Sequence, residues 1–99
     1  MSVPLEEMIA IVRDTETPPG KLARVAESLG RVKNSPAVRP ILLELLGTQR
    51  DPVALEGVIY GLRSHMNPEV LQKIRDLIGD ESIHPLVRLI ASEAILQEE

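Results

Sequence analysis

Two interleaved series of prolines divide the chain into regular segments. One series recurs every 32 residues and the other every 33 residues, and their members are Pro4, Pro36 and Pro68, and Pro19, Pro52 and Pro85. Proline is tolerated in the first turn of a helix, where its missing N–H costs no hydrogen bond, but it disrupts a helix interior. The spacing therefore predicts two helix starts in each period of the sequence.

Aliphatic residues recur in register with the second proline series. Three, six and ten residues after its prolines, the chain holds Leu22, Leu55 and Arg88, then Val25, Val58 and Ala91, then Leu29, Leu62 and Ile95. Positions three, six, seven and ten lie on one face of a helix with 3.6 residues per turn. A period of 32–33 residues that contains two helices is typical of a helical solenoid.

Polar residues before three of the prolines supply candidate helix N-caps. Ser35, Asp51 and Asn67 each precede a proline, and such side chains can accept the free N–H groups of a first turn. We expect helices at about 3–14, 19–32, 36–47, 52–65, 68–79 and 85–98. The short connections predict an all-α domain over residues 1–99, with hairpins at about 3–32, 36–65 and 68–98.

The composition fits a domain that folds in water. Hydrophobic residues make up 43% of the chain and charged residues 26%, close to the globular average. Tyr60 is the only aromatic residue, so we expect an aliphatic core. The sequence shows no leader, no stretch near the ~18 apolar residues of a membrane span, and no cysteine. These features favour a cytoplasmic location and exclude disulfides and thiolate chemistry.

The net charge of −4 disfavours nucleic acid as a partner, because proteins that neutralise phosphates are usually basic. Basic residues do cluster on and after the second expected helix, at Lys21, Arg24, Arg31 and Lys33. However, the chain offers no aromatic residue besides Tyr60 to stack on a base. Nucleic-acid binding is therefore the weakest of the binding hypotheses.

Two segments carry a family resemblance: Asp51-Pro52 leading to Val58 and Leu62, and Pro-Leu-Val-Arg-Leu-Ile-Ala at 85–91 leading to Ile95. They resemble the HEAT-like helical repeat family, an armadillo-like type of α-solenoid. The resemblance implies a right-handed stack of three hairpins whose second helices line a concave side, in a family of scaffolds, inhibitors and a few enzymes. Leu22 and Leu55 stand where the family often has arginine, so the asparagine–arginine ladder of some members is not available here.

Outward positions on the second helices form the candidate binding surface. Positions five, eight and twelve residues after each proline of the second series lie opposite the expected core face. They are Arg24, Glu27 and Arg31, then Gly57, Tyr60 and Ser64, then Ile90, Glu93 and Gln97. An ordinary solvated face is the alternative interpretation of this set.

Tyr60 is the sharpest candidate, because a lone aromatic residue on an outward face has the properties of an interface anchor. Gly57 and Gly61 flank it, although each costs a helix roughly 1 kcal/mol relative to alanine. Two glycines four residues apart let another backbone come close. Either an adjacent helix packs tightly there, which would make Tyr60 a half-buried core residue, or a partner does.

No residue pattern indicates catalysis or metal binding. His65 and His84 fall at expected helix ends, where histidine usually serves the backbone. The paired His-Glu dipeptides of iron-bearing HEAT-like enzymes are absent, as are nucleophile, phosphate-loop and dinucleotide motifs. We expect no enzymatic activity, no cofactor and no bound metal.

The last expected helix has hardly any polar face. Its apolar residues are Leu86, Val87, Leu89, Ile90, Ala91, Ala94, Ile95 and Leu96, whereas the terminal helix of a solenoid is usually polar outside. Either the helix is sandwiched inside the fold or another molecule covers it, and since it ends the chain, we expect the second. A homodimer through Leu86, Leu89 and Ile90, with Ile90 near its centre, is the simplest closed arrangement.

These observations favour a protein–protein interaction module that uses the concave face and the apolar C-terminal end. A scaffold and an inhibitor or immunity-type protein fit equally well, and the identity of the partner stays open. The alternative is a small enzyme, or an enzyme subunit, with a site in the concave groove. Ionisable residues that converge there with shifted pKa values would favour that alternative.

Overall fold

The computed structural model describes residues 4–98, which form six α-helices and a short 3₁₀ turn and contain no strand. The elements are α1 (Leu5–Arg13), α2 (Pro19–Gly30), α3 (Val38–Thr48), α4 (Pro52–Leu62), η1 (Arg63–His65), α5 (Pro68–Ile78) and α6 (Pro85–Glu98). Each of the six helices expected from the sequence is present. The expected start of the first helix, residue 3, lies outside the described residues.

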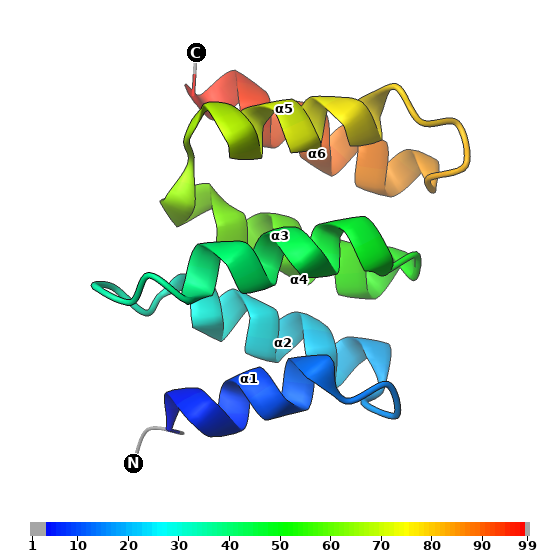
Figure 1. The fold of residues 1–99 in the computed structure, drawn as a ribbon. Coiled ribbons are helices and arrows are strands. Elements are labelled where there is room, and N and C mark those ends of the chain that lie inside the picture. The colour runs from blue at the N-terminus through cyan, green and yellow to red at the C-terminus, as the bar shows by residue number, and fades with distance from the viewer. Residues whose placement is uncertain (1–3, 99) are drawn as a thin grey trace.

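The helices pair into three hairpins that stack on one another, from α1 and α2 at one end to α5 and α6 at the other (Figure 1). Contacts along the stack connect α2 with α4 and α4 with α6, and α3 meets α5. The stack therefore has two layers, with α1, α3 and α5 in one and α2, α4 and α6 in the other. Helices α2, α4 and α6 all begin at the same edge of the molecule (Figure 1).

Two of the expected N-caps are confirmed by hydrogen bonds. The Asp51 carboxylate accepts from the N–H groups of Val53 at 2.9 Å and Ala54 at 3.3 Å. The Asn67 side-chain oxygen accepts from the Val70 N–H at 2.7 Å. These bonds satisfy donors that the first turns of α4 and α5 leave free.

The cap expected at Ser35 is wrong. Helix α3 begins at Val38, and no side chain caps it. Asn34 adopts a left-handed backbone conformation, with φ of 66°, and so redirects the chain before the helix. The Val38 N–H then bonds the carbonyl oxygen of Ser35 at 3.4 Å, so Ser35 contributes its backbone rather than its side chain.

The core is aliphatic, as expected from the sequence. Its largest fully buried side chains include Leu29, Leu42, Leu55, Ile59, Leu62 and Ile74. The aliphatic columns read from the sequence are buried, apart from half-buried Val25 and Arg88. Arg88 is accommodated because its Nε donates to the carbonyl oxygen of Ile78 at 2.9 Å, at the end of α5.

Helices α2 and α4 approach each other more closely than side chains normally permit. A Cβ atom on Gly57 would overlap the backbone of Ala23, and one on Gly61 would lie 2.5 Å from the carbonyl oxygen of Ala26. Tight internal packing, one of the two explanations considered for Gly57 and Gly61, is therefore the one the structure bears out. This close contact between α2 and α4 holds the first two hairpins together.

Candidate functional site

Helix α4, in the middle of its layer, leaves a narrow strip of its surface uncovered. It packs against α2, α3 and α6. Val53 and Glu56 are exposed, and Tyr60 and Arg63 are partly exposed. Because these four residues follow one another at intervals of three and four, they lie on a single helical face.

The equivalent face of α6 is more apolar. The residues 33 positions further along the chain are Leu86, Leu89, Glu93 and Leu96, and the three leucines are 61%, 55% and 68% exposed. Because α4 and α6 are in contact and run in the same direction, Val53, itself 52% exposed, and Leu86 occupy equivalent positions at the starts of two neighbouring helices. We call the two strips together the α4/α6 surface; its residues are Val53, Glu56, Tyr60, Arg63, Leu86, Leu89, Glu93 and Leu96.

The structure corrects the outward face expected from the sequence at two positions. Gly57 is buried against α2, so it offers no surface to a partner. Ile90 is half-buried, and the outermost positions of α6 are Leu86, Leu89 and Leu96. For Gly57 the reason is that α4 has a neighbour on each side in its layer and α3 behind it, so only residues that point directly away from α3 stay uncovered.

The other expected binding residues remain accessible to different degrees. Arg24, Arg31, Ser64, Glu93 and Gln97 are exposed, and Glu27 is half-buried. On α2 the Arg31 guanidinium pairs with the Glu27 carboxylate at 3.5 Å. The residues of α2 lie across the layer from α6, so the structure does not bring the whole expected set into one patch.

Tyr60 is half-buried and carries a cation over its ring. The guanidinium carbon of Arg63 lies 5.5 Å from the ring centroid, within the range of a cation–π contact. The two residues are three positions apart on the same face, across the end of α4. This contact keeps the tyrosine ring in place on the α4/α6 surface and adds a positive charge at that end.

Sequence reasoning missed half of this surface, namely Val53, Glu56, Arg63 and Leu96. A signal was available, because Leu86 had been singled out and the residue 33 positions earlier is Val53. If the repeat period is applied to the exposed positions as well as to the core, it identifies Val53 as the equivalent of Leu86 and Glu56 as the equivalent of Leu89.

Both histidines serve the backbone, as expected. The His65 Nε2–H donates to the carbonyl oxygen of Gly30 at 3.0 Å, and the Nδ1 of His84 accepts from the Leu86 N–H at 3.1 Å. Within residues 4–98, no group of three or more His, Asp or Glu side chains is placed to hold a metal ion.

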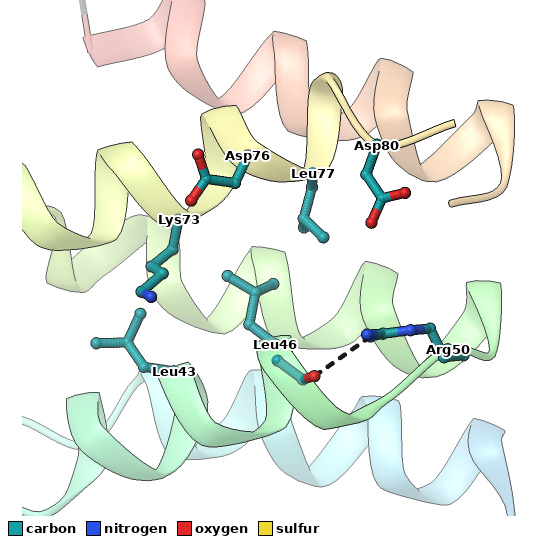
Figure 2. A pocket seen from close by; sticks show the side chains of 8 residues that line it. Leu43, Leu46, Arg50, Lys73, Asp76, Leu77 and Asp80 are labelled. Carbon is teal, nitrogen blue, oxygen red and sulfur yellow. Dashed lines mark hydrogen bonds between the residues drawn. The ribbon is translucent and has the colours of Figure 1, made fainter. Parts of the chain in front are cut away.

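A groove lies in the other layer, between α3 and α5 (Figure 2). Leu46 and Leu77 are buried in its floor beside half-buried Leu43. Charged residues of both signs, Arg50, Lys73, Asp76 and Asp80, form its rim. Figure 2 shows the Arg50 guanidinium donating to the carbonyl oxygen of Gly47, at 3.3 Å. The rim has no consistent charge that would select a ligand.

Asp80 ends this groove and has a lowered pKa. Its carboxylate accepts hydrogen bonds from the Ser82 hydroxyl at 2.6 Å and the Ser82 N–H at 2.9 Å. These bonds are the main cause of the lowered pKa; desolvation of the carboxylate opposes them, and the positive charges of Arg50 and Arg88 have smaller lowering effects. The carboxylate is thereby committed to holding the loop between α5 and α6.

No helix of residues 4–98 is long and apolar enough to span a membrane. Comparison with curated proteins and with solved structures finds no match for the chain. A family model for HEAT repeats matches residues 5–95, which covers all the stacked hairpins except the ends of the chain. With the repeat period, the stacked hairpins and this match in agreement, the chain belongs to the HEAT-repeat family.

Proposed function

We propose that this chain is a protein–protein interaction module that binds its partner through the α4/α6 surface. The observation that carries the proposal is the exposure of Val53, Leu86 and Leu89 on two adjacent helices. Large aliphatic side chains that gather on the surface of a folded domain usually mark a contact site. Protein binding is also the general use of HEAT repeats, the family to which the chain belongs.

The proposal specifies binding rather than catalysis. Tyr60 supports it, because a partly exposed tyrosine beside aliphatic side chains is a frequent anchor in interfaces. The enzyme alternative required ionisable groups converging on the same face, whereas the lowered pKa of Asp80 belongs to the opposite layer and has a structural cause. Scaffold and inhibitor remain equal versions of the binding function, in the cytoplasm as expected from the composition.

Self-association is the alternative use of the apolar end of the stack. The exposed row Leu86, Leu89 and Leu96 supports it, because these residues, and not Ile90, are the outermost on α6. Under a two-fold axis across α6, Leu86 would meet Leu96 of a second copy and Leu89 would meet Glu93. Sedimentation equilibrium on the parent and on Leu89→Ser separates this mode from binding to a different protein.

Affinity capture from the source cell, followed by mass spectrometry, tests the proposed function. The bait is the parent chain, with Leu86→Ser/Leu89→Ser as the surface variant and Glu16→Ser, in the distant loop between α1 and α2, as the matched control. We expect one stoichiometric protein with the parent and the control, and its loss with the double variant. Equal capture by all three baits would reject the α4/α6 surface as the binding site.

A further inference from the structure

We infer that the partner element recognised by the α4/α6 surface is a basic amphipathic helix, an inference that rests on the binding function proposed above. The apolar part of the surface is the group formed by Val53, Leu86 and Leu89. Two carboxylates, those of Glu56 and Glu93, stand beside it. Together these two features select a ligand that has an apolar face with positive charge beside it.

Glu56 and Glu93 are exposed. Ion pairs between side chains that the structure describes join Arg13 with Glu44 and Arg31 with Glu27, and neither pair involves these two glutamates. The cation nearest along α4, Arg63, stands over the Tyr60 ring at the far end of the surface. The negative charge beside the aliphatic group is therefore available to a ligand.

The two glutamates flank Leu89 on both helices. Glu56 is the α4 equivalent of Leu89, 33 residues earlier, and Glu93 follows Leu89 by one turn of α6. A ligand that covers Leu89 must therefore pass close to both carboxylates. Lysine and arginine serve this position well, because their aliphatic stems cover apolar surface while their charged heads reach outward.

The exposed residues also have the spacing that suits a helix. Val53, Glu56 and Tyr60 on α4, and Leu86, Leu89 and Glu93 on α6, form two rows with intervals of three and four residues on parallel helices. A third helix laid on them presents its own residues at the same intervals, so one apolar face can meet both rows. An acidic helix of the same shape would place carboxylates against Glu56 and Glu93.

Charge also decides against the competing occupants. A second copy of this chain carries the same net charge of −4 and brings its own Glu93 to the contact. Nucleic acid would place phosphates against the two glutamates. Repulsion of like charges lowers the affinity of each of these ligands, whereas a cationic helix gains from the same groups.

Two synthetic helical peptides of about 18 residues, long enough to cover α4 and α6, serve as probes. They share one leucine face and differ only in carrying lysine or glutamate at the polar positions. Fluorescence anisotropy should show tight binding of the lysine peptide and weak binding of the glutamate peptide. Raising the salt concentration should reduce the difference, because the glutamates are exposed.

The matched variants remove equal charge from two places. Glu56→Gln/Glu93→Gln should weaken binding of the lysine peptide by about tenfold, since each exposed pair contributes roughly two- to fivefold. Glu7→Gln/Glu69→Gln, at exposed positions of α1 and α5 in the other layer, should leave it within twofold of the parent. Leu89→Ser should weaken both peptides, and circular dichroism melts confirm that the variants remain folded.

The outcomes separate this inference from the proposed function. If Leu89→Ser abolishes binding while the two peptides bind the parent equally, the surface remains a protein-binding site and its preference for a basic helix is refuted. The inference fails if Leu89→Ser does not weaken binding of the lysine peptide. It also fails if Glu56→Gln/Glu93→Gln and the control pair weaken that binding equally, because the peptide then responds only to net charge. A parent dimer that dissociates on Leu89→Ser would assign the surface to a second copy instead.

Discussion

Gly30 and Gly61 lie backbone against backbone, so that a Cβ atom on Gly30 would overlap the Gly61 peptide. Gly30 ends α2 and Gly61 lies in the last turn of α4. Gly57 likewise lies against Ala23. At these glycines the backbones of α2 and α4 come closer together than a side chain would allow. In the other layer an open groove separates α3 from α5. The stack is therefore held together mainly on the layer that carries Tyr60.

Gly61→Ala should destabilise the fold. The added Cβ would lie 2.5 Å from the Ala26 carbonyl oxygen, which belongs to backbone and cannot turn away. Overpacking of this kind costs roughly 1–3 kcal/mol, more than the ~1 kcal/mol that alanine gains in helix propensity. Urea unfolding measures the change. Gly47→Ala is the control, because nothing lies within 4 Å of its Cβ, and we expect it to leave stability equal or raised.

Leu62→Ala should cost roughly 2–5 kcal/mol of unfolding free energy, because the side chain is fully buried and its loss leaves a cavity. Thermal melts followed by circular dichroism check the result. For a domain of marginal stability the loss can prevent folding altogether, so Leu62→Met, which nearly conserves volume, is measured beside it. A Leu62→Ala variant that melts with the parent would show that the core does not depend on this position.

Tyr60→Ala should affect both binding and stability. The side chain is partly buried, so we expect a stability loss of about 1 kcal/mol, and as an interface anchor a further binding loss of roughly 2 kcal/mol or more. Tyr60→Phe keeps the ring and the Arg63 contact and should retain most of both. Binding to the captured partner is measured by calorimetry. Stability loss without any loss of affinity would make Tyr60 a core residue only.

Local signals in the sequence predicted most of the fold. Proline at Pro52 and Pro68, with Asp51 and Asn67 before them, determines helix starts through bonds within one turn. Aliphatic columns such as that of Leu29 and Leu62 predicted the buried face, because burial in a stack repeats with the chain. Ser35 failed as a cap because the chain turns through a left-handed conformation at Asn34 and α3 begins only at Val38.

The position of the candidate surface depended on contacts between distant residues. The helical period gives the angle between Gly57 and Tyr60, but it does not say which of them faces away from the stack. That depends on how closely α2 approaches α4, which Ala23 and Ala26 decide from more than thirty residues away. The exposure of Val53 beside Leu86 likewise appears only when α4 and α6 are placed side by side.

The lowered pKa of Asp80 predicts how stability changes in acid. Its folded pKa lies below the ordinary value of 3.8, so the ionised carboxylate stabilises the fold above that value, and this contribution is lost as the pH falls through the folded pKa. The Asp80→Asn variant has an uncharged amide in place of the carboxyl group, so it serves as the comparison without this titration. The melting temperature of the parent should exceed that of Asp80→Asn at neutral pH, and the gap should close below about pH 4. A gap that is constant with pH would show that the charge of the Asp80 carboxylate does not contribute to stability.

His65 should stabilise the corner where α2, α3 and η1 meet. Its Nε2–H donates to the Gly30 carbonyl oxygen at 3.0 Å, and its own carbonyl oxygen accepts from the Arg39 Nε at 2.9 Å. His65→Ala would leave the last carbonyl of α2 without this donor, at a cost of about 1 kcal/mol, whereas His65→Gln can still donate and should recover part of it. Urea unfolding of the parent, His65→Ala and His65→Gln measures these differences, and a His65→Ala variant as stable as the parent would contradict the assigned donor.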